Sequence, residues 1–129
     1  MSATVPDRLR RYLAADSHGA IAAYLFGSEA RGTAGPRSDV DVGVLFGAAP
    51  APTLNAQPME LEDDLRAELG RPVQVIVLDT ASPDLIHRVL RDGLLVLDRD
   101  PAERIRFEVR ARNEYFDLKP FLDRYRRVS

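Results

Sequence analysis

The sequence of 129 residues contains no cysteine, no tryptophan and only two histidines, His18 and His87. Without cysteine the chain has no disulfide and no thiolate metal site, and two imidazoles are too few for the usual structural zinc site. Any metal ion must therefore be bound through oxygen atoms. The formal net charge of -2 argues against a basic surface that binds nucleic acid, so we expect no direct nucleic-acid partner.

Long apolar runs are also missing, since no stretch approaches the roughly 18 residues that a membrane-spanning helix needs. The N-terminal segment from Met1 to Asp16 carries charges where a secretory peptide has its apolar part. We therefore expect a cytoplasmic protein without a membrane partner. A chain of this length fits a single domain, here residues 1–129.

The spacing of apolar residues predicts alternating helices and strands. Helices are expected at about 5–15, 28–31, 59–69, 83–91 and from 101 onward, and strands at 21–26, 39–46, 73–78 and 94–97. Residues 47–58 are expected to form a proline-rich connection, and Pro120 is expected to kink or interrupt the last helix. This order predicts an α+β fold, an α/β sandwich with a small mixed sheet of about four strands and flanking helices.

One motif suits the binding of phosphate. Gly27 follows an apolar strand and precedes a short helix, so the backbone can turn sharply and present the first N–H groups of that helix to an anion. The hydroxyl of Ser28 adds a donor. Arg31 is either a phosphate contact or an exposed helix arginine. Ser38 either caps the loop that follows or contributes to the site.

A pair of carboxylates follows on the next strand. Asp39 and Asp41 are two residues apart, so their side chains leave the same face, about 6.5 to 7 Å apart along the backbone. Two unpaired carboxylates at this separation repel each other, and a shared Mg²⁺ ion is the usual remedy in an oxygen-only site. Gly43 continues this face and is expected to leave room for a ligand.

Gly-Ser, Ala-Arg-Gly and Ser-Asp-x-Asp at this spacing resemble the motif of the minimal nucleotidyltransferases of the DNA polymerase beta-like superfamily, especially the MNT antitoxins of HEPN/MNT toxin–antitoxin modules. The resemblance implies a polymerase beta palm-like fold and AMP transfer from ATP to a tyrosine of a HEPN ribonuclease toxin. Carried onto this chain, it implies that Gly27 and Ser28 hold phosphates and that Asp39 and Asp41 bind two Mg²⁺ ions.

The chain departs from this pattern at one position. The family normally has a third acid on the next core strand, but the corresponding run here is Val73-Gln74-Val75. An amide cannot accept a proton near pH 7 and is a weaker Mg²⁺ ligand than a carboxylate. Asp79 lies five residues further on and faces the other way, so it cannot substitute. We therefore expect ATP and Mg²⁺ to bind, with slow or absent transfer.

The C-terminal segment, residues 101–129, has more apolar surface than a small sheet needs to cover. Two neighbouring stripes at helical spacing are Phe107, Ala111, Tyr115, Leu118, Leu122 and Tyr125, and Ile105, Val109, Arg112 and Phe116. Either one stripe packs on the domain while the other meets a partner protein, giving a homo- or hetero-oligomer, or the helix is wrapped in its own domain. The acids Glu29 and Glu62 and the imidazole of His87 are expected on solvated helix surfaces.

Three functions remain open from the sequence. The first is an adenylyltransferase that modifies a toxin tyrosine, which the intact Gly27-Ser28 turn and Asp39/Asp41 pair favour. The second is a catalytically impaired module that neutralises the toxin by covering it, which Gln74 favours. The third is a small-molecule nucleotidyltransferase, for which a chain of 129 residues leaves little room for an acceptor pocket.

Overall fold

A single mixed sheet organises the chain. The computed structural model describes residues 4–35, 37–47 and 56–128. Its strands are β1 (Ala22–Phe26), β2 (Val40–Leu45), β3 (Val73–Val77) and β4 (Leu94–Asp98), in the order β3-β2-β1-β4. Strand β1 pairs antiparallel with β2 and β4, while β2 pairs parallel with β3. The expected small mixed sheet is confirmed.

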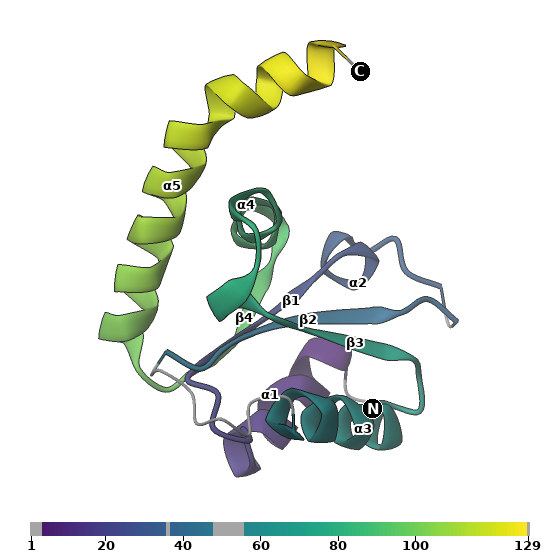
Figure 1. The fold of residues 1–129 in the computed structure, drawn as a ribbon. Helices are drawn as coiled ribbons and strands as arrows, with labels where there is room; N and C mark the ends of the chain where they lie inside the picture. Colours follow the sequence, from purple (N-terminus) through teal and green to yellow (C-terminus); the bar gives the residue numbers. More distant parts are fainter. Residues whose placement is uncertain (1–3, 36, 48–55, 129) are drawn as a thin grey trace.

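Helices cover both faces of this sheet (Figure 1). Helices α1 (Val5–Ala15) and α3 (Ala56–Leu69) lie on one face, and α4 (Pro83–Asp92) and α5 (Pro101–Val128) lie on the other. The short α2 (Ser28–Arg31) follows β1, and a 3₁₀ turn, η1 (Leu78–Thr80), follows β3. Helix α3 includes Pro58, so the end of the connection expected at residues 47–58 is helical. Residues 48–55 of that connection lie outside the described residues.

The alternation of side chains along β2 divides the core into two clusters. Val40, Val42 and Val44 are fully buried and pack with Leu9 of α1 and Leu65 of α3. The other face of the sheet packs against α4 and α5 through a second cluster, which contains Ala22, Tyr24, Leu45, Leu78, Ile86, Val89, Phe107 and Ala111. Because side chains alternate along a strand, Asp41 lies on this second face.

Helix α5 packs its buried apolar side chains along its N-terminal half, and an ion pair between Arg126 and Asp84 of α4 joins its C-terminal half to the domain. Phe107, Ala111 and Tyr115 are buried against the domain, and the hydroxyl of Tyr24 donates to Glu108 over 2.6 Å. The helix then continues through Pro120 without the expected interruption, although its axis bends in the C-terminal part (Figure 1). The bend agrees with the hydrogen bond that a proline removes from a helix.

Two side chains that were expected on solvated helix surfaces have structural contacts instead. Glu62 of α3 accepts a hydrogen bond from the backbone N–H of Val75 over 2.8 Å, so its carboxylate covers the outer edge of β3. The ring of His87 in α4 stacks on Tyr115 of α5, with ring centroids 3.7 Å apart. Both contacts join elements that are distant in sequence, which is why helical periodicity alone did not predict them.

Candidate functional site

Gly27 forms a turn between β1 and α2. Its φ of 74° is in the left-handed region, where a side chain is disfavoured. A Cβ atom built on Gly27 would also clash with Oδ2 of Asp41. The glycine therefore does two things: it turns the chain into α2, and it lets the Asp41 carboxylate lie directly against the turn.

The two carboxylates lie at the start of β2. Asp41 pairs with Phe26, the last residue of β1, while the exposed Asp39 immediately precedes the strand. Within the described parts of the chain, neither carboxylate accepts a hydrogen bond or forms an ion pair. Burial raises the pKa of Asp41, the charge of Asp39 raises it further, and Arg31 partly opposes them. Two mutually repelling carboxylates without a protein partner fit a divalent cation.

Gln74 lies next to Asp41 on β3. The two residues are direct partners in the parallel β2–β3 register, so their side chains leave the same face of neighbouring strands, which lie about 4.8 Å apart. In residues 4–35, 37–47 and 56–128, no group of three or more His, Cys, Asp and Glu side chains could hold a metal ion. The oxygen ligands available at the predicted metal site are therefore two carboxylates and, beside them, an amide.

Asp79 is occupied elsewhere. Its carboxylate accepts the backbone N–H groups of Phe46 at 3.0 Å and Gly47 at 2.9 Å, beyond the end of β2 that is remote from Asp41. This contact caps the strand and agrees with the prediction that Asp79 does not replace the third acid.

The expected open space at Gly43 is filled. A Cβ atom at this position would lie 3.1 Å from Cδ2 of Leu78, whose side chain is fully buried. The 3₁₀ turn η1 carries this leucine over β2, and that turn was not predicted. Gly43 thus admits a core side chain, and the surface available to a ligand is limited to the Asp41 end of the strand.

Ser38 and Arg31 have different surroundings. The Oγ atom of Ser38 accepts the N–H of Gly35 over 2.9 Å, so this serine caps the loop, one of the two expected roles. The exposed Arg31 ends α2. Burial and the charge of Asp39 raise the pKa of Asp41, and the positive charge of Arg31 partly opposes this rise.

One ion pair beside the site was not predicted from the sequence. Glu29 in α2 has a side chain only 15% exposed and forms an ion pair with Arg71, so it is not the solvated helix residue that was expected. Arg71 lies between the end of α3 and the start of β3, 42 residues after Glu29 in the sequence. The sequence pattern does not indicate this pair, because an arginine between Gly70 and Pro72 is typical of an ordinary turn.

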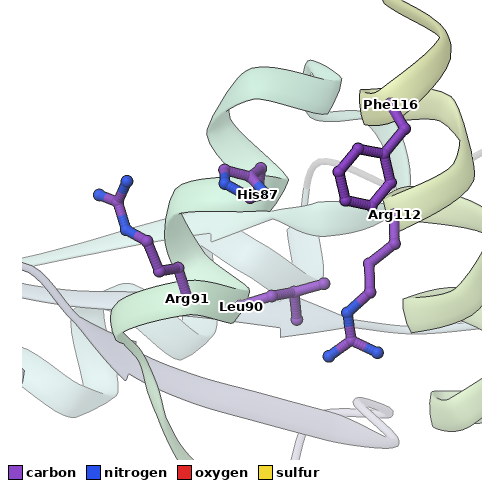
Figure 2. Close-up of a pocket in the computed structure, with 5 residues that line it drawn as sticks. All are labelled: His87, Leu90, Arg91, Arg112 and Phe116. Carbon is purple, nitrogen blue, oxygen red and sulfur yellow. The ribbon is translucent and has the colours of Figure 1, made fainter. Parts of the chain in front are cut away.

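A second feature on the same side of the sheet is a recess between α4 and α5. Its volume is about 230 Å³, and it is lined by His87, Leu90, Arg91, Arg112 and Phe116. Figure 2 shows Phe116 and Arg112 on the α5 side and the other three on α4. The recess combines cationic groups with an aromatic ring that is 62% exposed.

Helix α5 also exposes large apolar side chains. They belong to Ile105, Val109, Phe116, Leu118, Phe121 and Tyr125, which are 40–75% exposed. The first of the two predicted stripes is buried as far as Tyr115 and becomes exposed or half-buried beyond it, while the second is exposed. Helix α5 is therefore not wrapped in its own domain along its whole described length, and apolar surface is left over.

Comparison with known proteins gives a family match over most of the chain. The family described as "Polymerase beta, Nucleotidyltransferase" matches residues 9–102, which include β1, β2, β3 and the residues of the candidate site. No curated protein matches the chain. No helix in the described part of the chain is both long and apolar enough to span a membrane.

Several solved structures share the fold. A toxin–antitoxin structure with AMP-PNP is 22% identical with a TM-score of 0.71, covering 94% of this chain and 98% of that chain. A complex of tri-AMPylated Shewanella oneidensis HEPN toxin with MNT antitoxin is 19% identical, with a TM-score of 0.65, covering 94% of this chain and 98% of that chain. A minimal nucleotidyltransferase structure is 29% identical over 69% of this chain and 86% of that chain, with a TM-score of 0.56.

The family match covers the Gly27 turn and the strands that carry Asp41 and Gln74, and the structural matches extend over nearly the whole chain. Within this fold, the Asp41 carboxylate lies against the Gly27 turn. The chain therefore belongs to the polymerase beta-type nucleotidyltransferase family.

Proposed function

We propose that this chain is an MNT-type antitoxin that binds a HEPN-type toxin and transfers AMP from ATP to a tyrosine of that toxin. The observation that carries the proposal is the contact between the Gly27 turn and the Asp41 carboxylate, because it brings the proposed phosphate site together with the proposed metal site. The similar solved structures support the choice of partner, since they include a HEPN toxin in complex with an MNT antitoxin.

The proposed reaction is a nucleotidyl transfer. The tyrosine oxygen forms a bond to the α-phosphorus of ATP, the bond from that phosphorus to the α,β-bridging oxygen breaks, and pyrophosphate leaves. The hydroxyl proton passes to a base or to water. Mg²⁺, held by Asp39 and Asp41, would neutralise phosphate charge and polarise the reacting phosphoryl group.

The residues of the chain divide this work. The turn at Gly27 and Ser28 offers backbone N–H groups and a hydroxyl to the phosphates, and Arg31 adds a positive charge nearby. Asp39 and Asp41 orient the metal ions. Gln74 cannot take the proton from the acceptor, because its amide is neutral near pH 7. We therefore expect nucleotide binding to survive better than transfer.

Gln74 also favours a second candidate function. In this second function, the chain neutralises the toxin by binding to its surface, with little or no AMP transfer. Both candidates need the same partner and differ in chemistry, so one experiment separates them.

That experiment is intact-mass analysis of the partner. The chain is incubated with ATP, Mg²⁺ and a HEPN-type toxin as the partner, and the partner is then weighed. A gain of one or more AMP masses supports transfer, whereas a stable complex without a mass gain supports neutralisation by binding. If the partner neither gains mass nor binds, both candidates are wrong. Omission of Mg²⁺ is the control for metal-dependent transfer.

We propose further that the partner docks on the exposed apolar surface of α5. This surface lies next to the recess formed by α4 and α5, where Arg91 and Arg112 supply positive charge. Exposed aromatic side chains beside arginines are typical of the residues that contribute most to protein interfaces. The C-terminal extension, residues 101–129, would then contribute the main contact with the partner.

Replacement of Phe121 by glutamate tests this docking surface. Phe121 is 65% exposed and is expected to be covered in the complex, so a buried charge there should weaken binding by about 30-fold or more. Met59→Glu is the matched control, because Met59 is 66% exposed on α3, across the sheet. Calorimetric titration of the partner gives both affinities. Equal affinities for the two variants would rule out this surface.

A further inference from the structure

Arg71 connects the two halves of the candidate site. Its guanidinium pairs with Glu29 in α2, the helix that follows the Gly27 turn. The same guanidinium donates to the backbone carbonyls of Gly35 at 3.2 Å and Ser38 at 2.8 Å, in the loop that leads to the aspartates. One side chain therefore holds both the phosphate-binding turn and the metal-binding loop.

These contacts matter most for Asp39, because this residue lies outside the β2 ladder and is exposed. On one side of it, the carbonyl of Ser38 accepts a hydrogen bond from Arg71. On the other side, the N–H of Val40 donates to the carbonyl of Pro72 over 2.9 Å. The segment of Arg71 and Pro72 thus fixes the peptides that flank Asp39.

The environment of Arg71 is unlike that of a surface ion pair. Its side chain is 17% exposed, and its Nε atom is buried without a hydrogen-bond partner among the residues that the structure describes. A buried donor without an acceptor is unfavourable, so the remaining contacts must offset the burial. Arginine suits this task because its planar fork serves a carboxylate and two carbonyls at once.

We propose that Arg71 is a positioning residue for the metal–nucleotide site. Its contacts with Glu29, Gly35 and Ser38, called here the Arg71 clamp, keep Asp39 beside Asp41, whose carboxylate lies against the Gly27 turn. The inference deepens the proposed function and rests on it, because Arg71 can orient a metal ligand only if the site binds metal and nucleotide. Arg71 itself is assigned no contact with substrate. The clamp explains how an exposed residue before a strand can serve as a metal ligand.

The test compares Arg71→Ala with Arg106→Ala, a control that removes an exposed arginine paired with Glu103 on α5. The half-saturating Mg²⁺ concentration for ATP binding is measured by calorimetry. Loss of a residue that orients metal ligands is expected to raise it about 10–100-fold in Arg71→Ala, with no change in the control. Arg71→Lys should recover part of the loss, because the charge remains while the fork is lost.

A second measurement does not depend on nucleotide. Hydrogen exchange of the peptides that cover residues 28–39 is followed in the free protein at a temperature where all variants are folded. Exchange should become about tenfold faster in Arg71→Ala, because charge-assisted hydrogen bonds to the loop are lost. A purely structural role would lower the melting temperature and leave the Mg²⁺ requirement of the folded variant unchanged.

The outcomes separate this inference from the proposed function. If the wild-type protein binds no ATP with Mg²⁺, the proposed function is wrong, and loop exchange alone decides whether the clamp exists. If the wild-type protein binds ATP with Mg²⁺ and Arg71→Ala needs the same Mg²⁺ concentration for that binding, the positioning role is overturned. Unchanged exchange of the loop overturns the clamp in either case.

Discussion

Replacement of Gln74 by aspartate is expected to increase the rate of AMP transfer by about 100-fold or more. The side chain at this position leaves the sheet beside Asp41, because the two residues are partners in the β2–β3 register. An aspartate there would complete a set of three carboxylates. It would bind the metal ion that faces the nucleophile and could accept the proton of the acceptor hydroxyl.

Gln74→Asn is the matched control, since asparagine has the length of aspartate without its charge. Single-turnover transfer to the partner should be faster only in the aspartate variant. ATP affinity should change much less than the rate, because the phosphate-binding turn is untouched. If the wild-type protein already transfers AMP at ordinary enzymatic rates and Gln74→Asp does not accelerate it, the account of Gln74 is wrong.

Replacement of Asp41 by asparagine is expected to abolish Mg²⁺-dependent ATP binding and, in metal-free buffer, to raise the melting temperature. Burial and the charge of Asp39 raise the pKa of Asp41 above its value in the unfolded chain. The folded state therefore prefers the protonated carboxyl, and ionisation at neutral pH costs stability. Asparagine removes this cost together with a metal ligand.

The sign of the pH dependence follows from the same shift. The stabilisation by Asp41→Asn should be present at pH 7 and shrink as the pH falls through the raised pKa, since protonation then neutralises the wild-type carboxyl as well. Addition of Mg²⁺ and ATP should reverse the order of melting temperatures. Ligand at 100 times its dissociation constant stabilises the wild-type protein alone, by about 2.7 kcal/mol.

Thermal unfolding with and without ligand measures both effects. Asp63→Asn serves as the control, because its carboxylate on α3 is 72% exposed and it should show neither change. A lower melting temperature of Asp41→Asn in metal-free buffer would contradict the electrostatic account of the site. Undiminished binding of ATP with Mg²⁺ would contradict its role as a metal ligand.

Local patterns were sufficient to predict most elements and the position of Asp41 next to the Gly27 turn. The apolar run before Gly27 and the alternation after Asp39 identify two strands, and antiparallel pairing then brings Asp41 next to the turn. The departure from the family motif at Gln74 could also be predicted, because the short run Val73-Gln74-Val75 is enough to identify the strand. The predicted and observed boundaries of the elements differ slightly, because backbone hydrogen bonding decides at which residue a helix or strand ends.

Contacts between distant segments could not be predicted in this way. Arg71 and Glu29 are 42 residues apart, and neither residue lies in a pattern that names the other. Leu78 fills the space above Gly43 because a 3₁₀ turn places it there, and three residues carry too little periodicity to reveal such a turn. These contacts depend on the packed fold.

The carboxylate of Glu62 has a consequence for how the molecule assembles. Strand β3 is an edge of the sheet, and its outward-facing N–H at Val75 already has an intramolecular acceptor. An additional strand from another chain would have to displace Glu62 to pair there, so β-augmentation at this edge is disfavoured. The sheet is thereby protected from edge-to-edge aggregation next to Gln74, and association through a helix remains open.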